Sequence, residues 1–139
     1  MDELIYDRTQ SDVNYALSNP DSANFLKGAY NYIDLNRIEQ WCGYVAQQLN
    51  LYDYTVSITV KTDWEMDDFP TKQQMKRIRD NVGKLKDAFY AFTSVPINLE
   101  KMTYTKANDI EKILYEINTL ISNMVATFWH SDEIYSGEA

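Results

Sequence analysis

The sequence predicts a mainly α-helical fold: a bundle of three long helices with a short N-terminal helix and one extended, β-like segment near residues 52–61. Three long stretches carry apolar residues at alternating steps of three and four, the spacing of one helix face. One further stretch alternates apolar and polar residues, as a strand does. The 139 residues are 45% apolar and contain no repeat or Gly/Ser linker. We therefore expect residues 1–139 to form a single helical domain with its own core.

The first two helices are expected on either side of a segment without clear periodicity. A short helix from Thr9 to Leu17 would be ended by the turn-forming residues 18–21. A long helix should begin at Asp34, acting as N-cap, and end near Asn50. Its apolar stripe consists of Leu35, Ile38, Cys42, Val45 and Leu49.

The extended segment alternates apolar and polar side chains with many β-branched residues, which favours a strand. Its apolar positions are Tyr52, Tyr54, Val56, Ile58 and Val60. A lone strand leaves its backbone groups unpaired, so it needs a partner. Three solutions are open: pairing with the weak segment Leu4 to Tyr6, pairing with another subunit, or an extended connection without strand pairing.

Two helices are expected in the second half. Thr71 and Gln74 match a capping box ahead of a helix that carries its apolar stripe as far as Phe92. Gly83 lies off that stripe and would permit a close helix crossing. After a loop around Pro96, Thr105 is the expected N-cap of the last helix. Its stripe should be the most buried, and it contains Ile110, Ile113, Leu114, Ile117, Leu120, Ile121, Met124, Val125 and Phe128.

Composition argues against several functions. A net charge of −8 disfavours nucleic-acid binding, and without a signal peptide or an apolar run of membrane-spanning length the expected location is cytoplasmic, with no membrane contact. His130 is the only histidine, and Cys42 lies on an apolar stripe. The acidic run 63–68 lacks the glycine that a calcium loop needs at its sixth position. We therefore expect no enzyme activity, no cofactor and no metal.

Aromatic residues are the least ordinary feature, with 11 Tyr, 5 Phe and 3 Trp. Tyr and Trp are enriched at protein interfaces, and several lie outside the helical stripes. This pattern favours a protein-interaction module that binds a protein partner or self-associates. The alternative is a carbohydrate-binding module in which Trp64 stacks on a sugar ring and Asp63 or Asp67 binds its hydroxyls. The candidate partner-binding residues are Tyr30, Tyr32, Tyr52, Tyr54 and Trp64.

Two stretches carry a family resemblance: residues 6–13, with the sequence YDRTQSDV, and residues 26–37, with the sequence LKGAYNYIDLNR. Together with the stretches Lys61 to Trp64 and Phe69 to Thr71, they resemble small uncharacterised modules of Gram-positive gut bacteria and their prophages. Such modules occur alone or appended to phage tail and other virion-associated proteins. The resemblance implies a structural or adhesive role in a phage-like particle, and it supplies no active-site residues.

Overall fold

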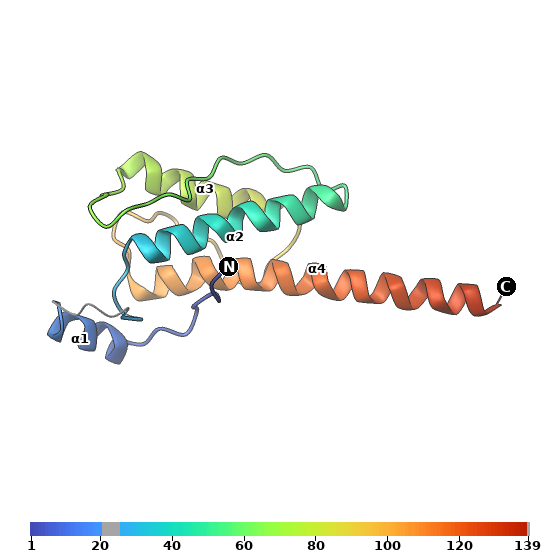
Figure 1. Cartoon of the computed structure of the whole chain (residues 1–139), viewed down its shortest axis with the longest axis horizontal. Helices are drawn as coiled ribbons and strands as arrows, with labels where there is room; N and C mark the ends of the chain where they lie inside the picture. The colour runs from blue at the N-terminus through green and yellow to red at the C-terminus, as the bar shows by residue number, and fades with distance from the viewer. Residues whose placement is uncertain (21–25, 139) are drawn as a thin grey trace.

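Four helices make up the regular structure, as expected of a helical bundle (Figure 1). The computed structural model describes the backbone of residues 1–20 and 26–138, and the side chains of residues 1–20 and 26–127. The helices are α1 (Gln10–Ser18), α2 (Tyr32–Leu51), α3 (Lys72–Ala88) and α4 (Tyr104–Glu138). The three long helices and the short N-terminal helix are thus confirmed.

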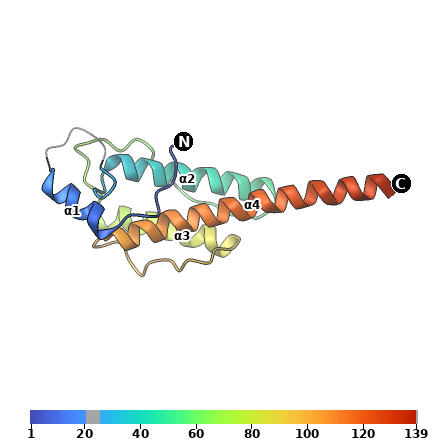
Figure 2. The ribbon, with the colours of Figure 1, turned by 90° about the horizontal axis from the view of Figure 1, so that it is seen from below.

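The three long helices run in the same direction, and the two connections between them return along the bundle (Figures 1 and 2). The first return runs antiparallel to α2, since Val56 contacts Asn50 near the end of that helix and Trp64 contacts Asn36 near its beginning. The second runs back along α3, where Lys86 donates to the carbonyl of Thr93. The N-termini of α2, α3 and α4 therefore lie at one end of the bundle.

The core lies where α2, α3 and α4 face one another. Each helix places an apolar stripe in this interface, and burying such side chains contributes roughly 1.5–3 kcal/mol each. The expected stripes are confirmed from Leu35 to Leu49 and from Ile78 to Leu85. In α4 the core residues of the expected stripe are Ile110, Ile113, Leu114, Ile117 and Ile121, whereas Leu120 is half-buried and lies outside the core. Cys42 is buried among them.

Capping residues explain where the helices start. Thr9 caps α1 and Thr71 caps α3, and both form capping boxes, the second with Gln74 as expected. The N-cap of α2 is Asn31 rather than Asp34, because Asp34 occupies the third helical position and completes the box from there.

The two later helix boundaries also differ from the expectation. Thr105 is not a cap, since α4 starts at Tyr104. At the other end, α3 stops at Ala88, so Phe92 leaves the stripe and is exposed.

The expected β-like segment at 52–61 is not a strand, and the described part of the chain contains none. Its alternation nevertheless has a structural meaning: Tyr54, Val56, Ile58 and Val60 pack toward the core, while the residues between them are exposed. Side chains of the helices take the place of a neighbouring strand. The segment is therefore an extended connection, the third of the open alternatives.

Helix side chains satisfy the backbone of this segment along its length. Asn50 pairs with Val56 through both its amide oxygen and its amide nitrogen. Arg77 and Asn81 of α3 both donate to the carbonyl of Thr59, at 2.7 and 2.8 Å. Because these bonds replace a strand ladder, the segment needs no second strand.

Two glycines have opposite environments. A Cβ on Gly28 would lie 2.1 Å from the carbonyl oxygen of Asp12, so only glycine lets the chain pass this close to α1. A Cβ on Gly83 would meet nothing within 4 Å. The expectation that Gly83 permits a close helix crossing is therefore wrong.

Candidate interaction site

The N-terminal segment before α1 is anchored in the bundle by Arg8, which is 4% exposed. Its guanidinium donates to the backbone carbonyls of Ile5 and Lys27, at 2.9 and 3.1 Å. Its backbone N–H donates to the side chain of Asn108, whose amide donates back to the Arg8 carbonyl. Arg8 thus joins the N-terminal segment, the chain before α2 and the first turns of α4.

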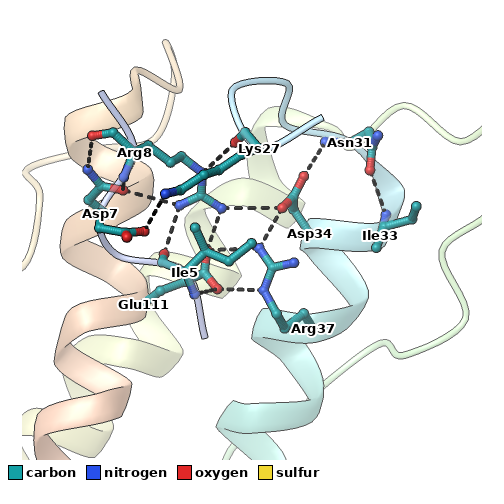
Figure 3. Close-up of polar contacts among 10 residues, drawn as sticks. Ile5, Asp7, Arg8, Lys27, Asn31, Ile33, Asp34, Arg37 and Glu111 are labelled. Atoms are coloured by element: carbon teal, nitrogen blue, oxygen red, sulfur yellow. Dashed lines mark hydrogen bonds and ion pairs between the residues drawn. The ribbon is translucent and has the colours of Figure 1, made fainter. Parts of the chain in front are cut away.

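Arg8 belongs to a buried ionic cluster with Asp34 and Arg37 of α2 and Glu111 of α4 (Figure 3). Arg8 Nη2 lies 2.6 Å from Glu111 Oε2 and 3.3 Å from Asp34 Oδ1. Arg37 donates through Nε to Glu111 Oε1 at 2.6 Å and through Nη2 to Glu111 Oε2 at 2.9 Å. Arg37 also bonds Asp34. Two guanidinium groups thus face two carboxylates, and every charge in the cluster is paired.

Burial and pairing act in opposite directions on these groups. Burial raises the pKa of Asp34, while its hydrogen bond from Arg37 opposes that shift. Burial also opposes the charged form of Arg37, but its hydrogen bonds to Glu111 and Asp34 prevail and raise its pKa. Asp34 further accepts from the backbone N–H of Asn31 at 2.9 Å. A site with three donors around one carboxylate fits the ionised form, so the cluster is a charge-balanced structural unit.

A groove of about 680 Å³ lies beside this cluster, at the end of the bundle where the long helices begin. Its wall includes Arg8 and the first residues of α2 and α4, Tyr32 and Tyr104. Most of the remaining lining is apolar. These apolar and aromatic residues are Val13, Tyr30, Leu35, Met66, Phe69, Pro70, Met75, Met102 and Ala107.

The rim of the groove carries exposed apolar residues and one acidic residue, Asp68. Phe69 is 88% exposed and Met66 is 75% exposed. They lie within the run that also carries Glu65, Asp67 and Asp68, all of them exposed. Monomeric proteins rarely present large apolar side chains together at a concave surface, and such surfaces are often binding sites. The arrangement suits an apolar ligand with positively charged groups.

The structure brings together two of the five tyrosine and tryptophan residues expected to bind a partner. Tyr30 and Tyr32 both line the groove. The guanidinium carbon of Arg8 lies 5.5 Å from the centre of the Tyr30 ring, a cation–π arrangement. Among the described residues, the buried Tyr30 hydroxyl has no hydrogen-bond partner. Burial raises its pKa well above the ordinary value, and the carboxylates of Glu111 and Asp34 add to the shift.

Tyr52 and Tyr54 lie at the opposite end of the bundle. Tyr52 is the C-cap residue of α2 and is partly exposed. The ring of Tyr54 packs edge-on against Phe89 with 5.0 Å between the ring centres. These two tyrosines are therefore not part of the groove.

Trp64 is buried, with 4% of its surface exposed, so its expected role as an exposed partner-binding or sugar-stacking residue is wrong. Its indole N–H donates to Glu39, which also accepts from the backbone N–H of Lys61 and from Arg77. Trp64 thus anchors the first return connection onto α2.

Arg8, Arg37 and Glu111 are not among the candidate functional residues that the sequence predicts. One signal was available: Arg8, Asp34 and Arg37 fall within the stretches 6–13 and 26–37 that carry the family resemblance. No signal marked Glu111, which lies between the apolar Ile110 and the exposed Lys112.

The residues considered for chemistry have ordinary surroundings where they are described. Burial raises the pKa of the Cys42 thiol, with a smaller contribution from Glu39, and a thiol held in that form is a poor nucleophile. The acidic residues 63, 65, 67 and 68 are exposed. Within the described residues, no group of three or more His, Cys, Asp or Glu side chains is placed to hold a metal ion. The side chains of Phe128, Trp129, His130 and Tyr135 lie outside the described part.

Comparison with known protein families, with characterised proteins and with solved structures yields no match for this chain. Among the described residues, no helix combines the length and the apolar character required to cross a membrane.

Proposed function

We propose that the chain is a non-enzymatic interaction module that binds an apolar, positively charged segment of another protein in the groove. One observation carries this proposal. Met66 and Phe69 are exposed, belong to an acidic run of the sequence, and border the concave, mostly apolar surface of the groove. Apolar contact supplies affinity, and the acidic run favours basic side chains on the partner.

The construction of the groove supports a binding role. Its wall is anchored by the ionic cluster, which fixes the N-terminal segment to α2 and α4 through Arg8. A site that is rigid before binding loses less conformational entropy on association. Met66, Met75 and Met102 lie in the lining, and flexible methionine side chains adapt to more than one ligand shape.

Association with a phage particle is part of the proposal and rests on the resemblance of residues 6–13 and 26–37 to prophage-encoded modules. In that setting the partner segment would belong to another component of the particle.

A peptide selection tests the proposal. A library of random peptides is selected on the purified chain, and the enriched peptides are titrated against three variants: Met66→Asp, Phe69→Asp and Leu17→Asp. Leu17 is exposed on α1 and does not line the groove, so it controls for the added charge. Because each substituted side chain is exposed, all three variants should fold normally.

The expected peptides combine apolar residues with Lys or Arg. The Leu17→Asp variant should bind them as the wild type does. The Met66→Asp and Phe69→Asp variants should bind at least ~10-fold more weakly, because each loses an apolar contact with the bound peptide and places a charge against the apolar residues of the peptide. No enrichment, or enriched peptides that bind all variants equally, would contradict the proposal. A glycan array on the same samples tests the carbohydrate alternative. If a glycan binds and no peptide does, and the Met66→Asp and Phe69→Asp variants lose that binding, the ligand of the groove is a carbohydrate.

A further inference from the structure

A second hollow, of about 640 Å³, lies between the first half of α3 and the connection that leads to α4. We call it the α3 groove. Helix α3 forms one side of it, and residues 97–100 form the other. Pro70 and Met75 line both the α3 groove and the groove described above. The two hollows are therefore neighbours, and one bound segment can extend from the first into the second.

The α3 side of this second hollow is basic. Lys72, Lys76 and Arg79 follow one another at steps of four and three residues, so they share one face of the helix. The side chains of Lys72 and Lys76 are 79% and 76% exposed. Arg79 is held by a hydrogen bond from its Nε to the carbonyl of Pro96, at 2.9 Å. Three cationic side chains thus line one hollow.

Two carboxylates share the α3 groove with these cations. Glu100 lies 2.9 Å from Lys72 Nζ. Asp80 lies 3.2 Å from Lys76 Nζ and 3.3 Å from Arg79 Nη1. Three cations against two carboxylates leave the lining with one excess positive charge. Because ion pairs at a protein surface contribute only ~0–1 kcal/mol, the two exposed lysines can pair instead with carboxylates of a ligand.

The neighbouring charges do not cancel this excess. Lys106 of α4 donates to the lining residue Asn98 at 3.1 Å. The pKa of Glu100 is lowered by its hydrogen bond from Lys72, with a further contribution from the charge of Lys106. The pKa of Lys72 is raised by Glu100 and, among the described residues, by no carboxylate of the acidic run 63–68. The acidic run therefore leaves the α3 groove basic.

An exposed apolar side chain borders the same hollow. Ile97 is 90% exposed, which is more than any other large apolar side chain among the described residues. Covering such a side chain removes apolar surface from water, so an exposed one at the edge of a groove favours binding. The α3 groove therefore suits a ligand that carries both apolar and acidic groups.

We infer that the partner segment proposed above continues past Pro70 into the α3 groove, and that this second part of the segment is acidic. The inference rests on the proposed function, since it extends the same bound segment. The basic part of the segment lies beside the acidic run 63–68, and its acidic part lies beside Lys72 and Lys76. One chain that occupies both hollows binds more tightly than two separate ligands, because its second contact is intramolecular.

Opposite charges at the two hollows also set the direction of the segment. If its basic and acidic parts exchanged places, each would lie beside charges of its own sign. Such like-charge contacts oppose binding. The basic and acidic parts should therefore occur in the same order in every ligand of this site.

A selection of random peptides of about 20 residues, long enough to span both hollows, tests the inference. Enriched peptides should contain an apolar part with Lys or Arg and a separate part with Asp or Glu, in a constant order. They are titrated against a double variant, Lys72→Gln with Lys76→Gln. The control double variant, Lys84→Gln with Lys112→Gln, removes the same charge at exposed positions that line neither hollow.

The Lys72→Gln, Lys76→Gln variant should bind these peptides at least ~3-fold more weakly, as expected for the loss of two surface ion pairs. The control should bind them as the wild type does, and circular dichroism verifies that both variants are folded. Enriched peptides without an acidic part, or equal binding to the two double variants, would overturn the inference.

Peptides shortened to remove the acidic part separate this inference from the proposed function. A shortened peptide should bind the wild type and the Lys72→Gln, Lys76→Gln variant equally, and it should still lose affinity for Phe69→Asp. Sensitivity to Phe69→Asp without any effect of the lysine substitutions on the full-length peptides would overturn the inference and leave the proposed function intact. Peptides that bind Phe69→Asp as they bind the wild type would contradict both.

Discussion

The side chain of Asn50 pairs with the backbone of Val56 in both directions, as a neighbouring strand would. Its Nδ2 donates to the Val56 carbonyl at 2.8 Å, and its Oδ1 accepts from the Val56 N–H at 3.0 Å. Asn50 is in the last turn of α2, so this pair turns the chain into the first return connection. A side chain thereby stabilises an extended backbone that has no strand beside it.

Asn50→Ala should lower the free energy of unfolding by about 1–3 kcal/mol, because the backbone groups of Val56 lose their partners. Urea unfolding followed by circular dichroism measures this change. Gln47→Ala, at an exposed position on the same helix, is the control and should change stability by less than about 0.5 kcal/mol. Equal effects of the two substitutions would show that the pair contributes nothing.

The ionic cluster should respond to charge balance more than to the number of contacts. Arg8→Met leaves Arg37 facing two carboxylates, and an unbalanced buried charge costs about 3–5 kcal/mol. Adding Asp34→Asn restores the balance, so the double variant should be more stable than Arg8→Met alone. Chemical unfolding of both single variants and the double variant measures this coupling. Strictly additive losses would contradict a charge-balanced cluster.

Tyr30→Phe should not destabilise the chain, since the Tyr30 hydroxyl has no hydrogen-bond partner among the described residues. Alkaline pH provides a second test. The pKa of Tyr30 is higher in the folded chain than in the unfolded chain, so ionisation favours unfolding. The wild type should therefore lose stability as the pH rises above about 10. Tyr30→Phe should lose less, as measured by thermal unfolding at pH 8 and in the alkaline range. An identical pH profile for both proteins would contradict the assignment.

The two glycines form a matched pair. Gly28→Ala places a Cβ against the backbone of Asp12 and should destabilise the chain by several kcal/mol or displace α1. Gly83→Ala meets open space inside a helix and should stabilise the chain by about 1 kcal/mol. Thermal unfolding of both variants measures the difference. A stable Gly28→Ala variant with an unchanged α1 would show that the close approach is dispensable.

Helix positions could be predicted from the sequence because they depend on local information. Apolar spacing and capping residues such as Thr71 and Gln74 act within a few residues of each other. The N-cap of α2 is harder to predict from local information. Asn31 and Asp34 are both good capping residues, and the sequence alone does not show which of them takes the cap and which the third helical position.

The backbone hydrogen-bond partners of the extended segment could not be predicted from the sequence of the segment itself. The alternation of apolar and polar side chains indicates which of them face the core. It does not indicate which groups form hydrogen bonds with the backbone of the segment. The partners, among them Asn36, Asn50 and Asn81, lie on helices and are brought close only by the tertiary fold. The same holds for the groove, where Tyr30, Met66 and Met102 converge from three separate connections.

Nuclear magnetic resonance titration of the labelled chain with a selected peptide tests the central claim most directly, because it locates the bound peptide. If the peptide binds in the groove, shifts should be confined to backbone amides around it, such as those of Gly28, Tyr32, Met66 and Ala107. Amides of α3 far from the groove, such as that of Lys84, should remain unchanged. Shifts centred on any other surface, or no shifts at a saturating concentration of peptide, would contradict the groove as the binding site.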